Sequence, residues 1–143
     1  MSKALNYLGI ARMSGNIELG EENAKALVKA GKARLLLLAA DASEGVKKRA
    51  NGYVFGFHTP IVELPFSKDE LGGATGRAQC AVAAIRDLGL AKSFADALAD
   101  EYGARYASVA QTLGEKQERR RARKAAGPGK RKATETGKRR KSE

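Results

Sequence analysis

Four consecutive leucines, residues 35–38, constrain the fold of this chain more than any other segment. A strand with one face in water alternates apolar and polar residues, whereas a strand covered on both faces is apolar throughout. The strand expected over residues 34–39 therefore lies inside a sheet that is covered on both faces. The apolar run of residues 35–40 is also much shorter than the ~20 residues that a membrane-spanning helix needs, so we expect no membrane segment.

Strand-like and helix-like segments alternate around this run. The expected strands cover residues 16–19, 34–39, 61–64 and 80–85, and the expected helices cover residues 3–13, 21–30, 44 onward, 68–74 and 90–102. The end of the third helix is open, because Asn51 and Gly52 resemble a C-cap while the apolar spacing continues to Gly56. Ser2, Ser43 and Ser67 are suitable N-caps. This alternation with short connections predicts an α/β fold, a three-layer α/β/α sandwich with a small four-stranded mixed sheet.

The positive charge of the chain is concentrated at its C-terminus. The 143 residues include 27 Lys and Arg and 16 Asp and Glu, for a formal net charge of +11. Residues 115–143 hold 13 of these basic and 4 of these acidic residues, so the preceding part is nearly balanced. We expect one folded domain over residues 1–114 and a basic low-complexity tail over residues 115–143. Residues 115–126 have a helix-forming composition, and the remainder is expected to be disordered.

The chain has few residues for catalysis or metal binding. His58 and Cys80 are the only histidine and cysteine, so a zinc site or a Cys-His nucleophile lacks the residues it needs. Asp41 follows a strand, where a phosphoacceptor could lie, but no acidic neighbour accompanies it to bind a metal. Cys80 is expected to be a small buried hydrophobe. We expect no enzyme activity, cofactor or metal, and a cytoplasmic protein, since one cysteine allows no intrachain disulfide.

The tail suits a polyanion such as nucleic acid. Clustered cations attract phosphates, and each phosphate that they neutralise releases counterions, without giving sequence specificity. A tail that only improves solubility is the alternative, whereas a membrane partner is disfavoured because no apolar face or lipidation site accompanies the charge. The expected phosphate contacts are Arg119, Arg120, Arg121, Arg123, Lys124, Lys130, Arg131 and Lys132.

Polar side chains gather at the start of the helix expected over residues 21–30. A helix N-terminus offers unpaired N–H groups and a positive dipole end to a ligand. Amide and carboxylate groups can read base edges, and lysines can hold phosphates. An acidic first turn that only satisfies the helix dipole is an equally open interpretation. The candidate residues are Gly20, Glu21, Glu22, Asn23, Lys25 and Lys29.

Two blocks of the sequence resemble a known family. They are LGIARMSGNIELGEENAKALVKAGKARLLLLAADAS, residues 8–43, and IVELPFSKDELGGATGR, residues 61–77. Together with the apolar strand up to Asp87, they resemble the bacterial YlxQ-like branch of the ribosomal-protein L-seven-Ae/L-thirty-e family. The resemblance implies an α/β/α sandwich that binds structured RNA, in the best-known members at kink-turns. We also expect a monomer whose RNA is ribosomal, with the ribosome as a partner.

The resemblance also indicates which residues contact RNA. The Asn-Glu pair of the family and its following lysine correspond to Glu22, Asn23 and Ala26, so the order of the pair is reversed and the lysine is absent. A second contact is implied for the loop after the Leu-Gly-x-Ala-x-Gly motif at residues 71–76, and Asp41 matches a position near the RNA surface. The residues of this loop are Arg77, Ala78 and Gln79, more polar than in kink-turn binders.

We therefore predict a non-enzymatic RNA-binding protein that is associated with the ribosome. The helix that starts after Gly20 and the loop at Arg77 would recognise the RNA, and the tail would add phosphate contacts. One alternative is a protein-interaction module that its basic tail anchors to the ribosome or nucleoid. Another is a recognition subunit for a separate RNA-modifying enzyme.

Overall fold

The computed structural model describes residues 2–126, in which four strands form one mixed sheet in the order β1-β4-β2-β3. β4 pairs antiparallel with both β1 and β2, whereas β3 pairs parallel with β2 at the edge of the sheet. The mixed four-stranded sheet predicted from the sequence is confirmed. The strands are β1 (Ile17–Leu19), β2 (Leu35–Leu38), β3 (Ile61–Glu63) and β4 (Val82–Ile85).

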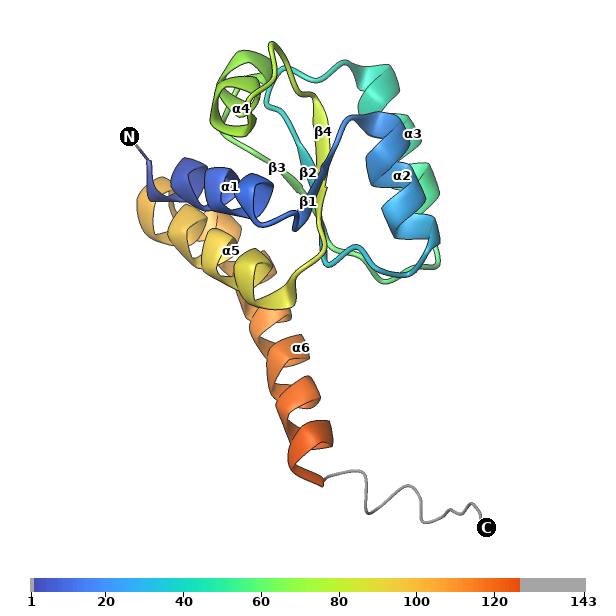
Figure 1. Cartoon of the computed structure of the whole chain (residues 1–143), viewed down its shortest axis with the longest axis vertical. Coiled ribbons are helices and arrows are strands. Elements are labelled where there is room, and N and C mark those ends of the chain that lie inside the picture. The colour runs from blue at the N-terminus through green and yellow to red at the C-terminus, as the bar shows by residue number, and fades with distance from the viewer. Residues whose placement is uncertain (1, 127–143) are drawn as a thin grey trace. The chain divides into compact units, whose positions relative to one another are not determined.

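Helices cover both faces of the sheet, which gives the predicted α/β/α sandwich (Figure 1). One layer consists of α1 (Lys3–Met13), α4 (Lys68–Thr75) and α5 (Leu88–Tyr102), and the other of α2 (Glu21–Lys29) and α3 (Glu44–Val54). Leu35 and Leu37 face the first layer, Leu36 and Leu38 face the second, and all four are at most 1% exposed. The leucine run is therefore a central strand buried on both faces.

The three predicted N-caps form. Ser2 and Ser43 accept hydrogen bonds from backbone N–H groups three residues later, and Ser67 makes a reciprocal capping box with Glu70. The start of α1 is also tied to the end of α5, because the Glu101 carboxylate accepts hydrogen bonds from the Ser2 hydroxyl and from two backbone N–H groups of α1. These hydrogen bonds to α1 hold the pKa of Glu101 below its usual value.

Several boundaries differ from those predicted. The end of the third helix, left open by the sequence, lies at Val54, so Asn51 and Gly52 are not its C-cap. α5 begins earlier than predicted because Asp87 caps it by accepting a hydrogen bond from the Leu90 N–H. β4 begins later because the Cys80 N–H donates to the Lys68 carbonyl of α4 instead of to a strand.

The segment after α5 contributes to the core, and the sequence analysis assigned it no element. A short 3-10 helix, η1 (Ala104–Tyr106), leads into α6 (Ala107–Ala126). Tyr106, Ala110 and Leu113 are buried in the core cluster, at helical spacing. The segment is rich in alanine, so its buried and exposed faces differ little in hydrophobicity and the sequence did not reveal the helix.

Two units make up the chain, Met1–Leu113 and Gly114–Glu143. The second unit begins as the continuation of α6, so residues 115–126 are helical, and the predicted disorder concerns residues 127–143, which lie outside the described residues. Within residues 2–126, no helix is long and apolar enough to cross a membrane.

Gly72 and Gly73 of α4 are predicted to respond oppositely to alanine. A Cβ on Gly72 would lie 2.6 Å from the Arg77 carbonyl oxygen, so the backbone of the following loop would have to move. A Cβ on Gly73 would have no atom within 4 Å outside the neighbouring residues and backbone of its own helix. We expect Gly72→Ala to lower the free energy of unfolding by about 1–3 kcal/mol. Gly73→Ala should raise it by about 0.5–1 kcal/mol, because alanine favours a helix. Urea unfolding of both variants measures this, and equal effects would contradict the close packing of Gly72.

Glu101 is predicted to make stability depend on pH. Its folded pKa is lowered, so its contribution is present above the pKa of the unfolded chain and is lost as pH falls through the folded pKa. Glu101→Gln should therefore lower Tm at pH 7 but not near pH 3, in thermal unfolding scans across this range. Asp100→Asn is the control on the neighbouring exposed residue. A Glu101→Gln deficit that stays constant with pH would contradict the role of the carboxylate.

Candidate nucleic-acid interface

The sheet topology brings most of the predicted site residues to one edge (Figure 1). Because β1 and β2 both run antiparallel to β4, their C-terminal ends meet the N-terminal end of β4. In the register, Leu19 pairs with Ala83, and Leu38 pairs with Val82. The residues that follow β1, follow β2 and precede β4 are therefore neighbours. We call these segments, residues 20–23, 39–41 and 77–81, the binding edge.

The Arg77 guanidinium lies beside Gly20 at the binding edge. Gly20 is the N-cap of α2 with φ +91°, and a Cβ placed on it would lie 3.5 Å from Nη1 of Arg77. The Gly20 N–H donates to the Val82 carbonyl at 2.9 Å, which fixes the start of α2 to the sheet. The positive φ explains why glycine suits this position. The helix N-terminus and the loop, predicted separately, thus form one surface.

Backbone hydrogen bonds fix the loop of residues 77–81 on both sides. The Arg77 N–H donates to the Gly72 carbonyl at 2.8 Å, and the Ala39 N–H donates to the Ala81 carbonyl at 2.9 Å. The side chains of residues 77–79 remain exposed on this fixed loop. The Gln79 amide donates to Asp69 of α4 at 3.0 Å. Because its backbone is already fixed, this loop loses little conformational entropy when it binds a partner.

Glu22, Asn23 and Lys25 are available to a ligand. All three are exposed, and Glu22 and Lys25 make no ion pair with other residues of the described chain. The Asn23 amide donates one hydrogen bond to the Leu19 carbonyl at 2.9 Å. Its Oδ1 and its second amide hydrogen remain for recognition. The hydrogen bond to Leu19 also orients the amide.

Glu21 and Asp41, two other predicted site residues, are engaged within the protein. Glu21 makes a bidentate ion pair with Arg49 of α3, at 2.7 and 3.1 Å, and the Arg49 guanidinium lowers the pKa of this carboxyl. Asp41 accepts a hydrogen bond from the Lys68 N–H at 2.8 Å, which joins the end of β2 to α4. Both residues hold the framework of the binding edge.

Arg12 lies beside the same surface, and the sequence analysis did not identify it. A Cβ on Gly76, the left-handed C-cap of α4, would lie 3.2 Å from Nη1 of Arg12. Arg12 belongs to α1, so no local pattern relates it to the loop at Arg77. Its exposed guanidinium adds a second cation to the loop side of the binding edge.

Cys80 lies beneath the loop as a buried thiol. It is 3% exposed, and burial raises its pKa, which confirms the predicted buried hydrophobe. Within residues 2–126, no group of three or more His, Cys, Asp and Glu side chains could hold a metal ion.

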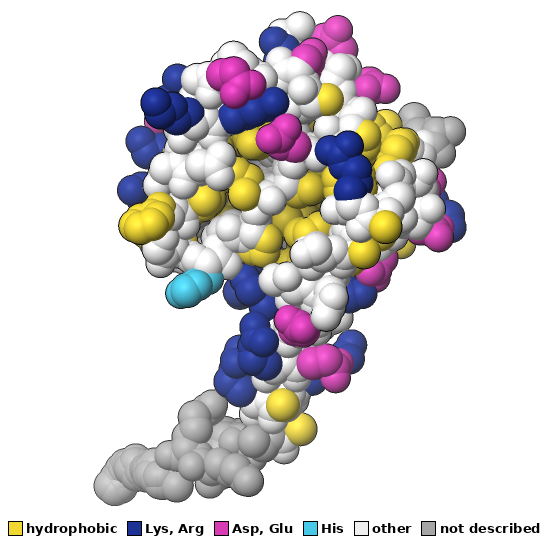
Figure 2. All heavy atoms as spheres, turned by 180° about the vertical axis from the view of Figure 1, so that it is seen from behind, with side chains coloured by type: hydrophobic (Ala, Val, Ile, Leu, Met, Phe, Trp, Pro, Cys, Tyr) yellow, Lys and Arg dark blue, Asp and Glu magenta, His cyan; other side chains and the backbone are white. Residues whose placement is uncertain are grey.

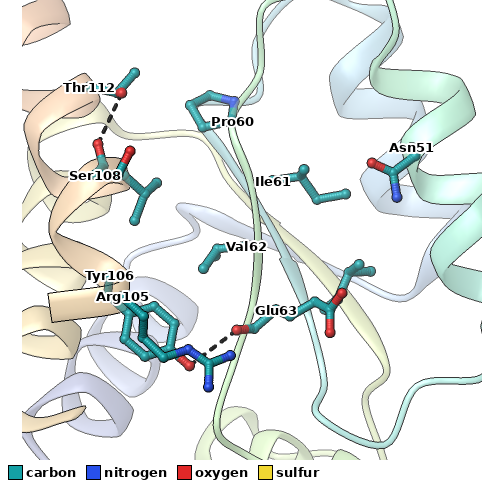
Figure 3. Close-up of a pocket in the computed structure, with 11 residues that line it drawn as sticks. Asn51, Pro60, Ile61, Val62, Glu63, Arg105, Tyr106, Ser108 and Thr112 are labelled. Atoms are coloured by element: carbon teal, nitrogen blue, oxygen red, sulfur yellow. Dashed lines mark hydrogen bonds between the residues drawn. The ribbon is translucent and has the colours of Figure 1, made fainter. Parts of the chain in front are cut away.

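Two of the hollows in the described part of the chain are relevant here, and one of them adjoins the binding edge. One, of about 370 Å³, lies between α2 and α3 and includes Glu21 and Glu22. The other, of about 550 Å³, lies along β3 and contains none of the predicted site residues (Figure 3). Tyr106 and Glu63 both line this second hollow, and the Tyr106 hydroxyl donates a hydrogen bond to the Glu63 carbonyl at 3.3 Å. Figure 2, which views the molecule from behind, shows apolar side chains at the middle of the face and charged ones around them.

The predicted phosphate contacts of the tail lie partly on α6. Those that are described are all exposed, and Arg121 pairs with Glu118 within the helix. Their spacing places cations around the helix rather than on a single stripe. The described residues are Arg119, Arg120, Arg121, Arg123 and Lys124. Lys130, Arg131 and Lys132 lie outside the described residues.

Known proteins share this fold and sequence. No protein-family model matches the chain. RNA-binding protein YlxQ of Enterococcus faecium is 36% identical over 90 residues, which cover 63% of this chain and 85% of that protein. A solved protein of unknown function from Bacillus halodurans has a TM-score of 0.64 and 26% identity, covering 68% of this chain and 98% of its own. The 15.5 kDa RNA-binding protein of Giardia lamblia has a TM-score of 0.55 and 22% identity, covering 76% and 85%.

The two solved structures share the three-layer α/β/α sandwich of this chain, and the Enterococcus faecium protein also shares its sequence. At 36% identity across most of the Enterococcus faecium protein, the chain belongs to the YlxQ family.

Proposed function

We propose that this protein is a non-enzymatic, ribosome-associated RNA-binding protein of the cytoplasm, which recognises structured RNA through the binding edge. The observation that supports this most directly is the position of the Arg77 guanidinium beside Gly20, at the start of α2. It joins a helix N-terminus to a fixed polar loop, in a chain whose relative is an RNA-binding protein.

Each part of the binding edge has a chemical role in this proposal. Glu22 and Asn23 supply acceptors and an amide donor for base edges, while Arg77 supplies a guanidinium that can hold a base or a phosphate. Unpaired N–H groups at the start of α2 favour an anion. Ala78 and Gln79 extend the contact surface. The RNA would be a kink-turn-like, internally looped structure, since proteins read RNA sequence mostly at unpaired bases that loops and bulges expose.

The tail adds affinity rather than specificity. Its described cations are exposed on α6 and suit phosphates that lie beyond the binding edge. A monomer is sufficient for this arrangement, because the binding edge is complete within one chain.

The alternative is a protein-interaction module that the tail anchors to the ribosome or nucleoid. The observation that favours it is β3, which is an edge strand beside the hollow shown in Figure 3 and could pair with a strand of a partner. This alternative requires that RNA affinity vanish when the tail is removed.

Asn23→Ala and Arg77→Ala are each predicted to weaken binding to the preferred RNA by about 1–3 kcal/mol, the range for base-edge contacts. Matched controls are Asn51→Ala and Arg34→Ala, which remove the same side chains at exposed positions outside the binding edge. Gel shifts should use a kink-turn RNA and a straight duplex of equal length, at two salt concentrations. Equal affinity for both RNAs, or equal losses in the control variants, would contradict structure-specific recognition by this edge.

Removing residues 115–143 is predicted to weaken binding to every RNA and to flatten its salt dependence. Each phosphate contact that is lost lowers the slope of log K against log salt by about 0.7–0.9, so several of the 13 cations should have a clear effect. A companion variant changes Arg119, Arg120, Arg121, Arg123 and Lys124 to Gln and keeps the chain length. An unchanged salt slope in both variants would show that the tail does not bind phosphates.

A further inference from the structure

The hollow between α2 and α3 lies next to the binding edge, with which it shares two residues. Its volume is about 370 Å³, and four of its residues come from α2 and three from α3. Both helices start at the binding edge, because they follow the parallel strands β1 and β2. An RNA strand that leaves the binding edge can therefore enter this hollow. The lining residues are Glu21, Glu22, Lys25, Lys29, Arg49, Gly52 and Tyr53.

Tyr53 has a buried hydroxyl that lacks a partner. The residue is 6% exposed, and its Oη makes no hydrogen bond within the described chain, where it is the only buried side-chain oxygen or nitrogen in this state. An unpaired buried hydroxyl is destabilising, and native proteins rarely keep one. Burial raises the pKa of Tyr53 to about 12, so the phenol stays protonated and can donate a hydrogen bond at any physiological pH.

The charges around this hydroxyl favour an anion. Glu21 and Arg49 form an ion pair, which leaves Lys25 and Lys29 against the single carboxylate of Glu22. Lys29 lines the hollow, and its Nζ also lies 5.8 Å from the centroid of the Phe57 ring, a cation-π contact with a residue outside the hollow. Neither lysine makes an ion pair within residues 2–126.

We propose that this hollow holds one phosphate group of the bound RNA, with Lys25, Lys29 and the Tyr53 hydroxyl as donors. Phosphate oxygens only accept hydrogen bonds, and these three groups can each donate one. Arg49 stays paired with Glu21 and helps to form the wall of the hollow. The inference rests on the proposed RNA binding and adds Tyr53 to the surface.

Tyr53→Phe in the full chain tests this assignment through two effects of opposite sign. Without RNA, removing an unpaired buried hydroxyl should raise Tm by on the order of 4 °C. Affinity for the preferred RNA should fall by roughly tenfold to a hundredfold, the loss expected for a hydrogen bond to a charged group. The salt slope should not change, because the substitution removes no charge. A variant that gains stability and loses affinity cannot owe its weaker binding to unfolding.

Lys25→Ala supplies the charged counterpart, and Lys48→Ala is its control. Lys48 is exposed on α3 but does not line the hollow. Lys25→Ala should weaken binding and lower the salt slope by about 1, whereas Lys48→Ala should leave both unchanged. Inorganic phosphate, titrated against the Tm of the wild type and Tyr53→Phe, tests whether a free anion enters the site.

The outcomes separate this inference from the function on which it rests. If Asn23→Ala and Arg77→Ala weaken RNA binding while Tyr53→Phe and Lys25→Ala stay within twofold of wild type, the binding edge stands and the phosphate site is overturned. If all four variants match the wild type, both proposals fail. If phosphate raises the Tm of the wild type alone and RNA affinity is unaffected by Tyr53→Phe, the site takes a free anion and the RNA assignment is overturned.

Discussion

Burial of β2 on both faces is the constraint on which the rest of the structure depends. Leu35 and Leu37 pack against one helical layer and Leu36 and Leu38 against the other, so a single strand requires both layers. A strand with this burial must also be paired on both sides, since unpaired backbone groups in the core are costly. β4 and β3 supply these pairs. Antiparallel pairing with β4 then places the loop at Arg77 beside the start of α2.

The surface created by this arrangement keeps features that stability alone would remove. Gly20 has a positive φ, and Tyr53 has an unpaired buried hydroxyl. The guanidinium of Arg12 lies beside Gly76, the residue that precedes Arg77. Each is unfavourable or neutral for folding. Exceptions of this kind to the general rules concentrate where a protein binds its partners. These features lie together at the binding edge and at the hollow between α2 and α3. The hollow along β3 has none of them.

Local signals in the sequence predicted much of the fold. Caps at Ser2, Ser43 and Ser67 act over three residues, and the burial of β2 follows from its uniform composition, so neither needs long-range information. Boundaries that depend on neighbouring elements were less predictable. β4 is shortened because the Cys80 N–H donates to the Lys68 carbonyl of α4. The burial of Tyr106 and Leu113 depends on a core that residues of α5 help to form, so their own segment does not reveal it.

By itself, the sequence determined the order of the elements, the central leucine strand, the separation of charge into the tail, and the candidate residues around Gly20 and Arg77. These follow from residue type and short-range spacing. Only the tertiary structure decided that Arg77 lies beside Gly20, that Arg12 lies beside Gly76, and that Glu21 is paired with Arg49. Such contacts join residues far apart in the chain, and the strand order β1-β4-β2-β3, which no local pattern encodes, sets which of them meet.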